Sequence, residues 1–241
     1  MKTNTQFKQE ALDALRGNWG KGVLVTLVFI LLSCMITGPS VYQSIQMQEA
    51  MQEFNLSSPA SIISAMADPE YIALQQKSSG ASSLTFLLEV FLLFPLAVGF
   101  VNCFRKLLVQ GDTALLKNMF CFSNYWKKVG GMLLMYVFIA LWTLLLIIPG
   151  IIKAFSYSMT PYLLDEYPQL SPSEAIHRSR MMMRGHKFDL FWLLLSFIGW
   201  AILSIITGGI GFLWLYPYMQ TALASFYEEV KADYELNGGL D

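Results

Sequence analysis

Glu89 is the first residue in this 241-residue chain that could do chemistry, because it is an acid inside a long apolar run at residues 84–104. A charge at the centre of a bilayer costs about 2.5–3.5 kcal/mol on insertion scales, so such an acid is a candidate for moving protons or ions. Glu89 lies only about five residues, roughly 8 Å of helix, past the start of this run. The alternative is therefore an interfacial acid that pairs with Lys153 or with a hydroxyl group.

A cluster of basic side chains in the C-terminal third is the second candidate. Each Lys or Arg next to an anionic leaflet contributes about 1 kcal/mol of attraction, which favours binding of lipid headgroups or phosphate. The alternative is that these residues only set the topology and anchor a helix at the interface. Asp165 and Glu166 are acids that could pair with this cluster. The candidate lipid- or phosphate-binding residues are Arg178, Arg180, Arg184, His186 and Lys187.

The sequence holds no recognisable catalytic or metal-binding constellation. His177 and His186 lack the spacing of metal ligands, and the three cysteines are scattered along the chain. A nucleophile–base signature, a glycine-rich phosphate loop and an HExxH motif are all absent from the sequence. We therefore expect no enzymatic activity, no metal and no cofactor.

The composition indicates which elements must position these residues. The chain is 55% hydrophobic and only 14% charged, whereas a soluble domain carries about 25% charged residues. Apolar runs of about 20 residues match a hydrocarbon core about 30 Å thick. The sequence predicts an all-α, polytopic membrane protein with six transmembrane helices, at residues 22–37, 84–104, 130–148, 151–165, 188–206 and 210–226.

These six helices are expected to form three hairpins, each preceded by an amphipathic interfacial helix. The turns are predicted at Gly38-Pro39, Pro149-Gly150 and Gly208-Gly209. The second helix of each hairpin contains a proline, which should kink it. We expect one integral-membrane domain, 1–241, made of hairpin units at 1–110, 111–168 and 169–235. The first unit includes a long extracytoplasmic loop at 40–83, and the prolines are Pro95, Pro161 and Pro217.

Capping residues mark two of the interfacial helices. Thr3 with Gln6 and Ser171 with Glu174 have the spacing of a capping box. Gly185 is placed to end the second of these helices. The recurrence of Arg-Gly just before a span, at residues 16–17 and 184–185, favours an internal repeat. Ordinary turn and kink residues in unrelated hairpins are the alternative.

The distribution of charge predicts the orientation. With the N-terminus in the cytoplasm and six spans, every one of the 16 basic residues except Lys77 and Lys153 lies on the cytoplasmic side. Lys and Arg accumulate in cytoplasmic loops, so this bias supports two cytoplasmic termini. A five-span arrangement would place the basic cluster outside, against the same rule.

Several motifs together resemble a known family. They are Gly17-Asn18-Trp19, IPGIIKAFSYSMTPYLL at residues 148–164, AIHRSRMMMRGHKFDLF at 175–191, LSFIGW at 195–200 and GIGFLWLYPY at 209–218. The chain resembles the bacterial integral-membrane family called domain of unknown function 975. That family is distantly similar to the membrane domain of some glycerophosphodiester phosphodiesterases. The resemblance implies a bacterial plasma membrane and supplies no catalytic residues.

Three functions remain open at this stage. The first is a non-enzymatic membrane component that assists transport or binds lipid, with the bilayer and its anionic headgroups as partners. The second is a proton- or ion-coupled transporter that uses Glu89, and the third is an intramembrane enzyme. We expect no binding to nucleic acid, whereas a homo-oligomer or a partner membrane subunit is compatible with the sequence.

Overall fold

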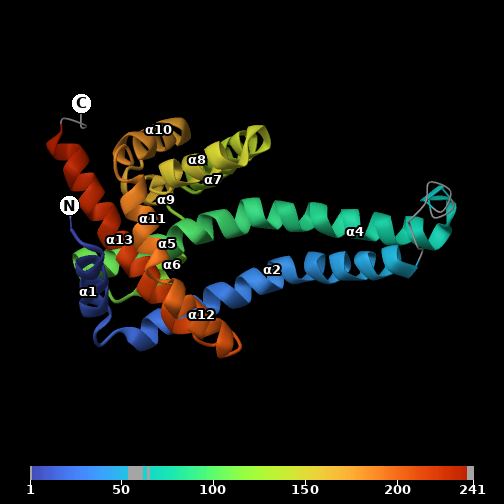
Figure 1. The fold of residues 1–241 in the computed structure, drawn as a ribbon, viewed down its shortest axis with the longest axis horizontal. Helices are drawn as coiled ribbons and strands as arrows, with labels where there is room; N and C mark the ends of the chain where they lie inside the picture. The colour runs from blue at the N-terminus through green and yellow to red at the C-terminus, as the bar shows by residue number, and fades with distance from the viewer. Residues whose placement is uncertain (1, 54–61, 64–65, 238–241) are drawn as a thin grey trace. The chain divides into compact units, whose positions relative to one another are not determined.

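The computed structural model describes residues 2–53, 62–63 and 66–237, and within these residues the chain is helical and contains no strand. The chain divides into two compact units (Figure 1). Unit 1 contains Met1–Phe29 and Phe94–Asp241, and unit 2 contains Ile30–Leu93. The predicted boundaries of the three hairpin units stay a prediction.

The elements follow one another as helices of very different length. They are α1 (Asn4–Leu15), α2 (Trp19–Glu53), α4 (Pro69–Leu88), the π-helix η1 (Glu89–Leu93), α5 (Phe94–Gln110), α6 (Leu115–Met119), α7 (Tyr125–Leu145), α8 (Ile147–Tyr157), α9 (Thr160–Glu166), α10 (Pro172–Met182), α11 (Lys187–Leu195), α12 (Ile198–Ile206) and α13 (Phe212–Leu236).

Helix α13 forms the centre of unit 1, where α1, α5, α10 and α12 all contact it. The buried face of α1 packs on it through Phe7, whose ring meets that of Phe226 edge-on with centroids 5.5 Å apart. Tyr227 stacks on Tyr162 of α9 at a centroid distance of 4.6 Å. The amphipathic helix predicted before the first hairpin is therefore present as α1, and its apolar face packs against protein.

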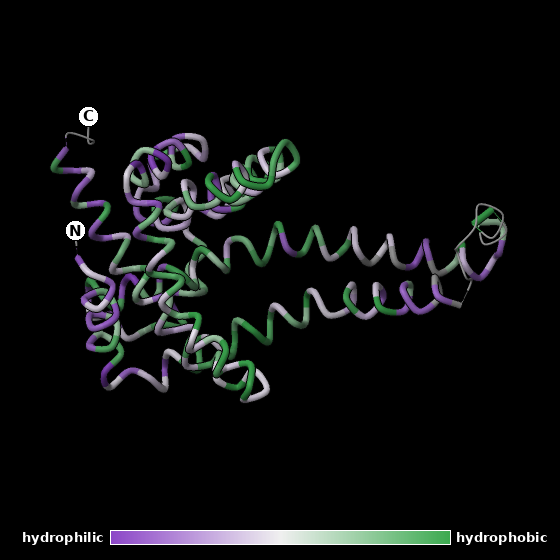
Figure 2. The backbone as a smooth tube through the Cα atoms, in the orientation of Figure 1, coloured by the Kyte–Doolittle hydropathy of each residue, from purple (hydrophilic) through white to green (hydrophobic). Residues whose placement is uncertain are grey.

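Charged and apolar segments separate within unit 1. Figure 2 shows hydrophilic residues concentrated on α1, α10 and the C-terminal half of α13, and hydrophobic residues on α7, α8 and α12. Large apolar side chains on α7, α8 and α12 are also exposed, among them Leu144 and Ile206. This distribution is the one expected when part of a helical protein faces acyl chains.

Unit 2 consists of the C-terminal part of α2, then α4 and η1. α2 is 35 residues long and contains Pro39 in its interior. At 1.5 Å per residue its length is roughly 50 Å, well beyond a hydrocarbon core of about 30 Å. The predicted stop at Gly38-Pro39 is therefore wrong, and residues 40–53 of the predicted loop are helical, as are residues 69–83. The rest of that loop falls largely outside the described residues.

Both predicted capping boxes are confirmed. Thr3 accepts a hydrogen bond from the backbone N–H of Gln6, and Ser171 accepts one from that of Glu174, with the reciprocal bond also made in each case. Gly17 and Gly185 follow these helices with φ of +79° and +95°, a conformation that favours glycine. The cap and the glycine are 14 residues apart in both copies (3 and 17, 171 and 185). The recurrence of Arg-Gly in the sequence is thus accompanied by the same cap and glycine conformation at both places.

The tips of two helical hairpins share a second repeated feature. A Cβ on Gly150 would lie 2.3 Å from Thr143 Oγ1, and one on Gly211 would lie 2.7 Å from Ser204 Oγ. Each hydroxyl donates to the carbonyl four residues earlier, at 2.8 Å in both cases. Each glycine follows its hydroxyl residue by seven positions (143 and 150, 204 and 211). Only glycine lets the two helices approach so closely beside the turn.

Two other sequence predictions need correction. The second turn centres on Leu146, which has extended φ and ψ, and Pro149-Gly150 lie in the first turn of α8. The predicted fourth span is two helices, since α8 ends at Tyr157 and Pro161 lies in the first turn of the separate helix α9 instead of kinking a continuous one. The predicted fifth span agrees with an apolar run, Lys187–Ile206, that is long enough to cross a membrane, and two residues separate its helices α11 and α12.

Candidate functional site

An ion-pair cluster, here called the Arg105 network, joins α5, α9 and α13 in unit 1. Its members are Arg105, Glu166, Tyr227, Glu228 and Lys231. The Arg105 guanidinium lies 3.3 Å from Glu166 and 3.0 Å from Glu228. Tyr227 donates its hydroxyl to Glu166 at 2.5 Å. Because Glu166 has three partners, its lone pairs are largely used within the protein.

Lys231 completes this network from the next turn of α13. Its ammonium lies 2.6 Å from Glu166 and 3.3 Å from Glu228. Partial burial of Lys231 lowers its pKa, but the hydrogen bond to Glu166 and the negative charges of Glu228 and Glu166 outweigh the burial, so the pKa is raised above its ordinary value. Lys231 therefore remains charged throughout the physiological range.

A second ion-pair cluster lies one residue earlier along the chain. Asp165 accepts from Lys128 of α7 at 2.6 Å and lies 3.3 Å from Lys106 of α5. The side chain of Lys128 is fully buried, and its ammonium also donates to the carbonyl of Cys121 at 3.0 Å. Adjacent acids, Asp165 and Glu166, thus meet adjacent bases, Arg105 and Lys106. These contacts fix α9 against α5, α7 and α13.

The interruption between α8 and α9 lets the two acids reach these partners. Ser179 of α10, which is fully buried, accepts from the N–H of Met159 at 3.2 Å and donates to the carbonyl of Ser156 at 3.0 Å. Asn102 of α5 donates to the carbonyl of Pro161 at 2.9 Å. Side chains from two other helices therefore satisfy the backbone groups that the break releases.

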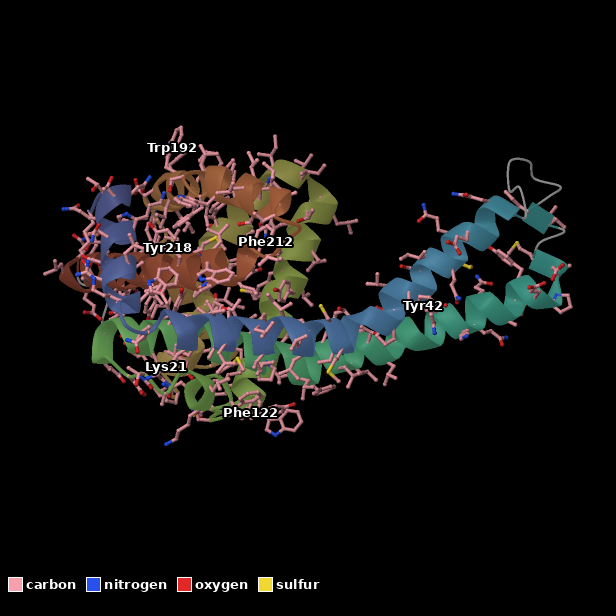
Figure 3. The ribbon with its side chains drawn as sticks, turned by 90° about the horizontal axis from the view of Figure 1, so that it is seen from below. Lys21, Tyr42, Phe122, Trp192, Phe212 and Tyr218 are labelled. Carbon is pink, nitrogen blue, oxygen red and sulfur yellow. The ribbon has the colours of Figure 1, made fainter. Side chains whose placement is uncertain are left out.

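A cavity of about 430 Å³ lies elsewhere in unit 1, between α1, the start of α2, α12 and α13. Its volume is within the range of small-molecule sites. Figure 3 shows Tyr218 and Phe212 on α13, and Tyr218 is one of the aromatic residues of the lining. The full lining is Leu12, Trp19, Trp200, Leu203, Ser204, Thr207, Gly211, Trp214, Leu215 and Tyr218.

The serine and threonine hydroxyls of this lining are already engaged. Ser204 donates to the carbonyl of Trp200, and Thr207 donates to the carbonyl of Ser204 at 2.9 Å while accepting from the N–H of Gly211 at 3.2 Å. What the cavity offers a ligand is therefore mainly aromatic and aliphatic surface. Such a surface suits an apolar chain better than a polar solute.

The predicted basic cluster is divided among several surroundings. The Arg178 guanidinium lies over the ring of Tyr167, 5.1 Å from its centroid, and Arg180 lies 3.1 Å from His177 Nδ1. Arg184 is exposed. His186 Nε2 lies 3.1 Å from Asp233 of α13. Lys187 begins α11, so these residues do not converge on one point.

The other two predicted candidates lie in different units. Glu89 is half-buried and begins η1 in unit 2. Pro95 follows shortly after; its ring would collide with the carbonyl of Phe91 in a regular α-helix, and a wider π turn relieves that collision. Lys153 of α8 lies over the ring of Trp142, 4.5 Å from the centroid. The pairing of Glu89 with Lys153 stays a prediction.

Pairing of Asp165 and Glu166 with the basic cluster is wrong, because both acids bind cations of α5, α7 and α13 instead. Arg105 and Lys106 directly follow the predicted span 84–104 and were not among the predicted site residues. The sequence does contain a signal for this pairing: two adjacent bases follow one apolar run, and two adjacent acids follow another. No group of acids, histidines and cysteines that could hold a metal ion occurs within the described part of the chain.

The fold and these clusters define an all-helical protein with four helices long and apolar enough to cross a membrane, within the residues described. Its Arg105 network joins α5, α9 and α13. The sequence profile of the family described as "Protein of unknown function (DUF975)" matches residues 1–234, and the chain belongs to this family. No curated protein and no solved structure matches the chain. The similarity to the membrane domain of glycerophosphodiester phosphodiesterases stays an expectation.

Proposed function

We propose that the chain is a non-enzymatic, multi-pass membrane protein that binds lipid, either as its main task or in support of transport. The observation that carries this proposal is the aromatic cavity between α1, α2, α12 and α13. Long apolar helices whose large side chains are exposed support residence in a membrane. The ion-pair clusters hold α5, α7, α9 and α13 together, so their acids and bases are engaged within the protein.

The proposed topology has three hairpins that enter a bacterial plasma membrane from the cytoplasmic face, where both termini lie. The charge bias of the sequence supports this orientation. The capped helices α1 and α10 support it further, because each is followed by a left-handed glycine and then by the start of an apolar helix.

The ligand chemistry follows from the lining. Three tryptophans and a tyrosine surround the cavity together with leucines, and the nearby hydroxyls donate to backbone carbonyls. An acyl chain matches this surface, since it needs no hydrogen bonds. Arg180 and Arg184 are exposed on and after α10 and could attract anionic headgroups.

Filling the cavity tests the proposal. Leu12→Trp adds a ring from α1 into the lining, whereas the control Ile202→Trp adds the same ring at an exposed position of α12 outside it. We expect Leu12→Trp to lower retention of phosphatidylglycerol and phosphatidylcholine in native mass spectrometry by about tenfold, the equivalent of about 1.4 kcal/mol. Equal retention by both variants and wild type would contradict binding in this cavity.

A triple variant distinguishes binding of the lipid headgroup from binding of the acyl chain. Replacement of Arg178, Arg180 and Arg184 by Gln should lower retention of phosphatidylglycerol and leave phosphatidylcholine unchanged. Unchanged phosphatidylglycerol retention would remove these arginines from the proposal without affecting the cavity.

One observation favours a second function, proton- or ion-coupled transport. Glu89 begins the π-helix η1, and π turns are frequent at functional sites. In reconstituted vesicles, Glu89→Gln should then abolish a flux that wild type supports, with Glu70→Gln, which changes an exposed acid of α4, as the control. Equal flux in wild type and Glu89→Gln would reject this role.

A further inference from the structure

The helices α11 and α12 meet at a break that divides a long apolar run. α11 ends at Leu195 and α12 begins at Ile198; Ser196 and Phe197 between them stay in the right-handed helical region, and each helix has nine residues. By length and composition the combined run, Lys187–Ile206, could cross a membrane. The position of this break relative to the membrane surface therefore sets how deep α12 reaches into the hydrocarbon.

Side chains of interfacial type surround the break. The Lys8 ammonium of α1 donates to the carbonyl of Ser196 at 2.9 Å and lies over the Phe197 ring, 4.5 Å from its centroid. The Phe197 ring meets that of Tyr218 with centroids 5.2 Å apart, and Tyr218 lies 6.5 Å from Trp19. Lysine, tyrosine and tryptophan gather where hydrocarbon meets water. The break thus lies at the level of the interface that carries α1.

The distance from this level to the turn is short. α12 has nine residues, so at 1.5 Å per residue it reaches about 14 Å, roughly half of a 30 Å hydrocarbon core. The turn follows at residues 207–211, and α13 then returns to Tyr218. No charged residue occurs between Asp189 and Glu228.

The turn itself is suited to hydrocarbon. Ile206 and Ile210 on either side are 74% and 62% exposed. The N–H groups of Gly208 and Gly209 donate to the carbonyls of Ile205 and Ser204, and that of Gly211 donates to the hydroxyl of Thr207. A turn in water can leave such groups to the solvent, but one in hydrocarbon must satisfy them internally.

We propose that the α12–α13 hairpin is re-entrant: it enters the membrane from the α1 side and turns back within the hydrocarbon, so that acyl chains of one leaflet surround its tip. The fifth and sixth predicted spans then insert without crossing. The side of the membrane on which each end of the hairpin lies is the same as in the six-span topology. This inference does not depend on lipid occupying the cavity.

Labelling of single cysteines tests the proposal. In full-length protein with Cys34 and Cys121 replaced by Ala, Ile206→Cys is exposed to a membrane-impermeant maleimide in sealed vesicles of each orientation. Arg184→Cys should react from the α1 side and Gln46→Cys, which the sequence places on the opposite side, from the other. We expect Ile206→Cys to react from neither side and to react fully once detergent is added.

Reaction of Ile206→Cys from the side where Gln46→Cys reacts would show a crossing hairpin, and reaction from the Arg184→Cys side would show a tip in water; either result overturns the proposal. Ile210→Cys repeats the measurement if the first variant does not give a monodisperse protein. The variant that retains only the buried Cys103 is the blank. A nitroxide at Ile206 should report a depth near the bilayer centre, and a headgroup depth would also contradict re-entrance.

Discussion

Replacement of Lys128 by methionine is expected to destabilise unit 1 by about 3–5 kcal/mol, the usual cost of removing one partner from a buried ion pair. Lys128 is fully buried and lies 2.6 Å from Asp165, whose side chain is only 6% exposed. Without the ammonium, Asp165 keeps only Lys106, at 3.3 Å, and the carbonyl of Cys121 loses a donor. Denaturant unfolding in detergent micelles measures the loss.

Two further variants decide whether loss of the Lys128–Asp165 ion pair causes the destabilisation. Lys117→Met removes a lysine whose side chain is exposed, and it should change the free energy of unfolding by less than about 0.5 kcal/mol. Lys128→Met combined with Asp165→Leu should be more stable than the sum of the single effects, by a coupling of about 0.5–3 kcal/mol. Strict additivity would mean that the pair does not hold α7 to α9.

Gly99→Ala is expected to cost about 1–3 kcal/mol or more, because it overfills a contact between backbones. A Cβ on Gly99 of α5 would lie 2.1 Å from the carbonyl oxygen and 2.9 Å from the carbonyl carbon of Met119. Neither atom can rotate away, so α6 as a whole would have to move from α5. The thermal midpoint of unfolding in detergent, followed by circular dichroism, should fall.

Gly80→Ala provides the matched control for this variant. Gly80 lies within α4, and a Cβ there meets nothing within 4 Å. Alanine in an open helical position should leave stability unchanged or raise it by up to about 1 kcal/mol. A Gly99→Ala variant as stable as Gly80→Ala would show that α5 and α6 are not in close contact.

Local signals in the sequence predicted much of the fold. Apolar runs indicated long helices, and both capping boxes and the left-handed conformation of Gly185 depend on residues within one turn of the feature they form. Two of the wrong predictions concern Gly38-Pro39 and Pro149-Gly150, both treated as turns. Proline suits the first turn of a helix, as at Pro149, and a helix interior can accommodate it when the lost hydrogen bond is tolerated, as at Pro39.

Pro161 is a local signal for the break that follows Tyr157, whereas the break at Ser196 carried none. Each depends on a residue distant in the chain: Ser179 of α10 satisfies the first, and Lys8 of α1 donates to the second. The ion pairs of Asp165 and Glu166 depend on the break between α8 and α9 as well. Such features follow from the packing of whole helices, which a single sequence does not display.

The pair of Lys128 and Asp165 also has a consequence for the order of events during synthesis. The two residues are 37 positions apart, which at 5–20 residues per second corresponds to about 2–7 s of translation. During that interval the Lys128 ammonium lacks its partner Asp165, and we expect it to stay hydrated. The start of α7 is thereby expected to stay at the aqueous face while the rest of its hairpin is synthesised. Lys128 becomes buried only after α9 has been made and supplies Asp165.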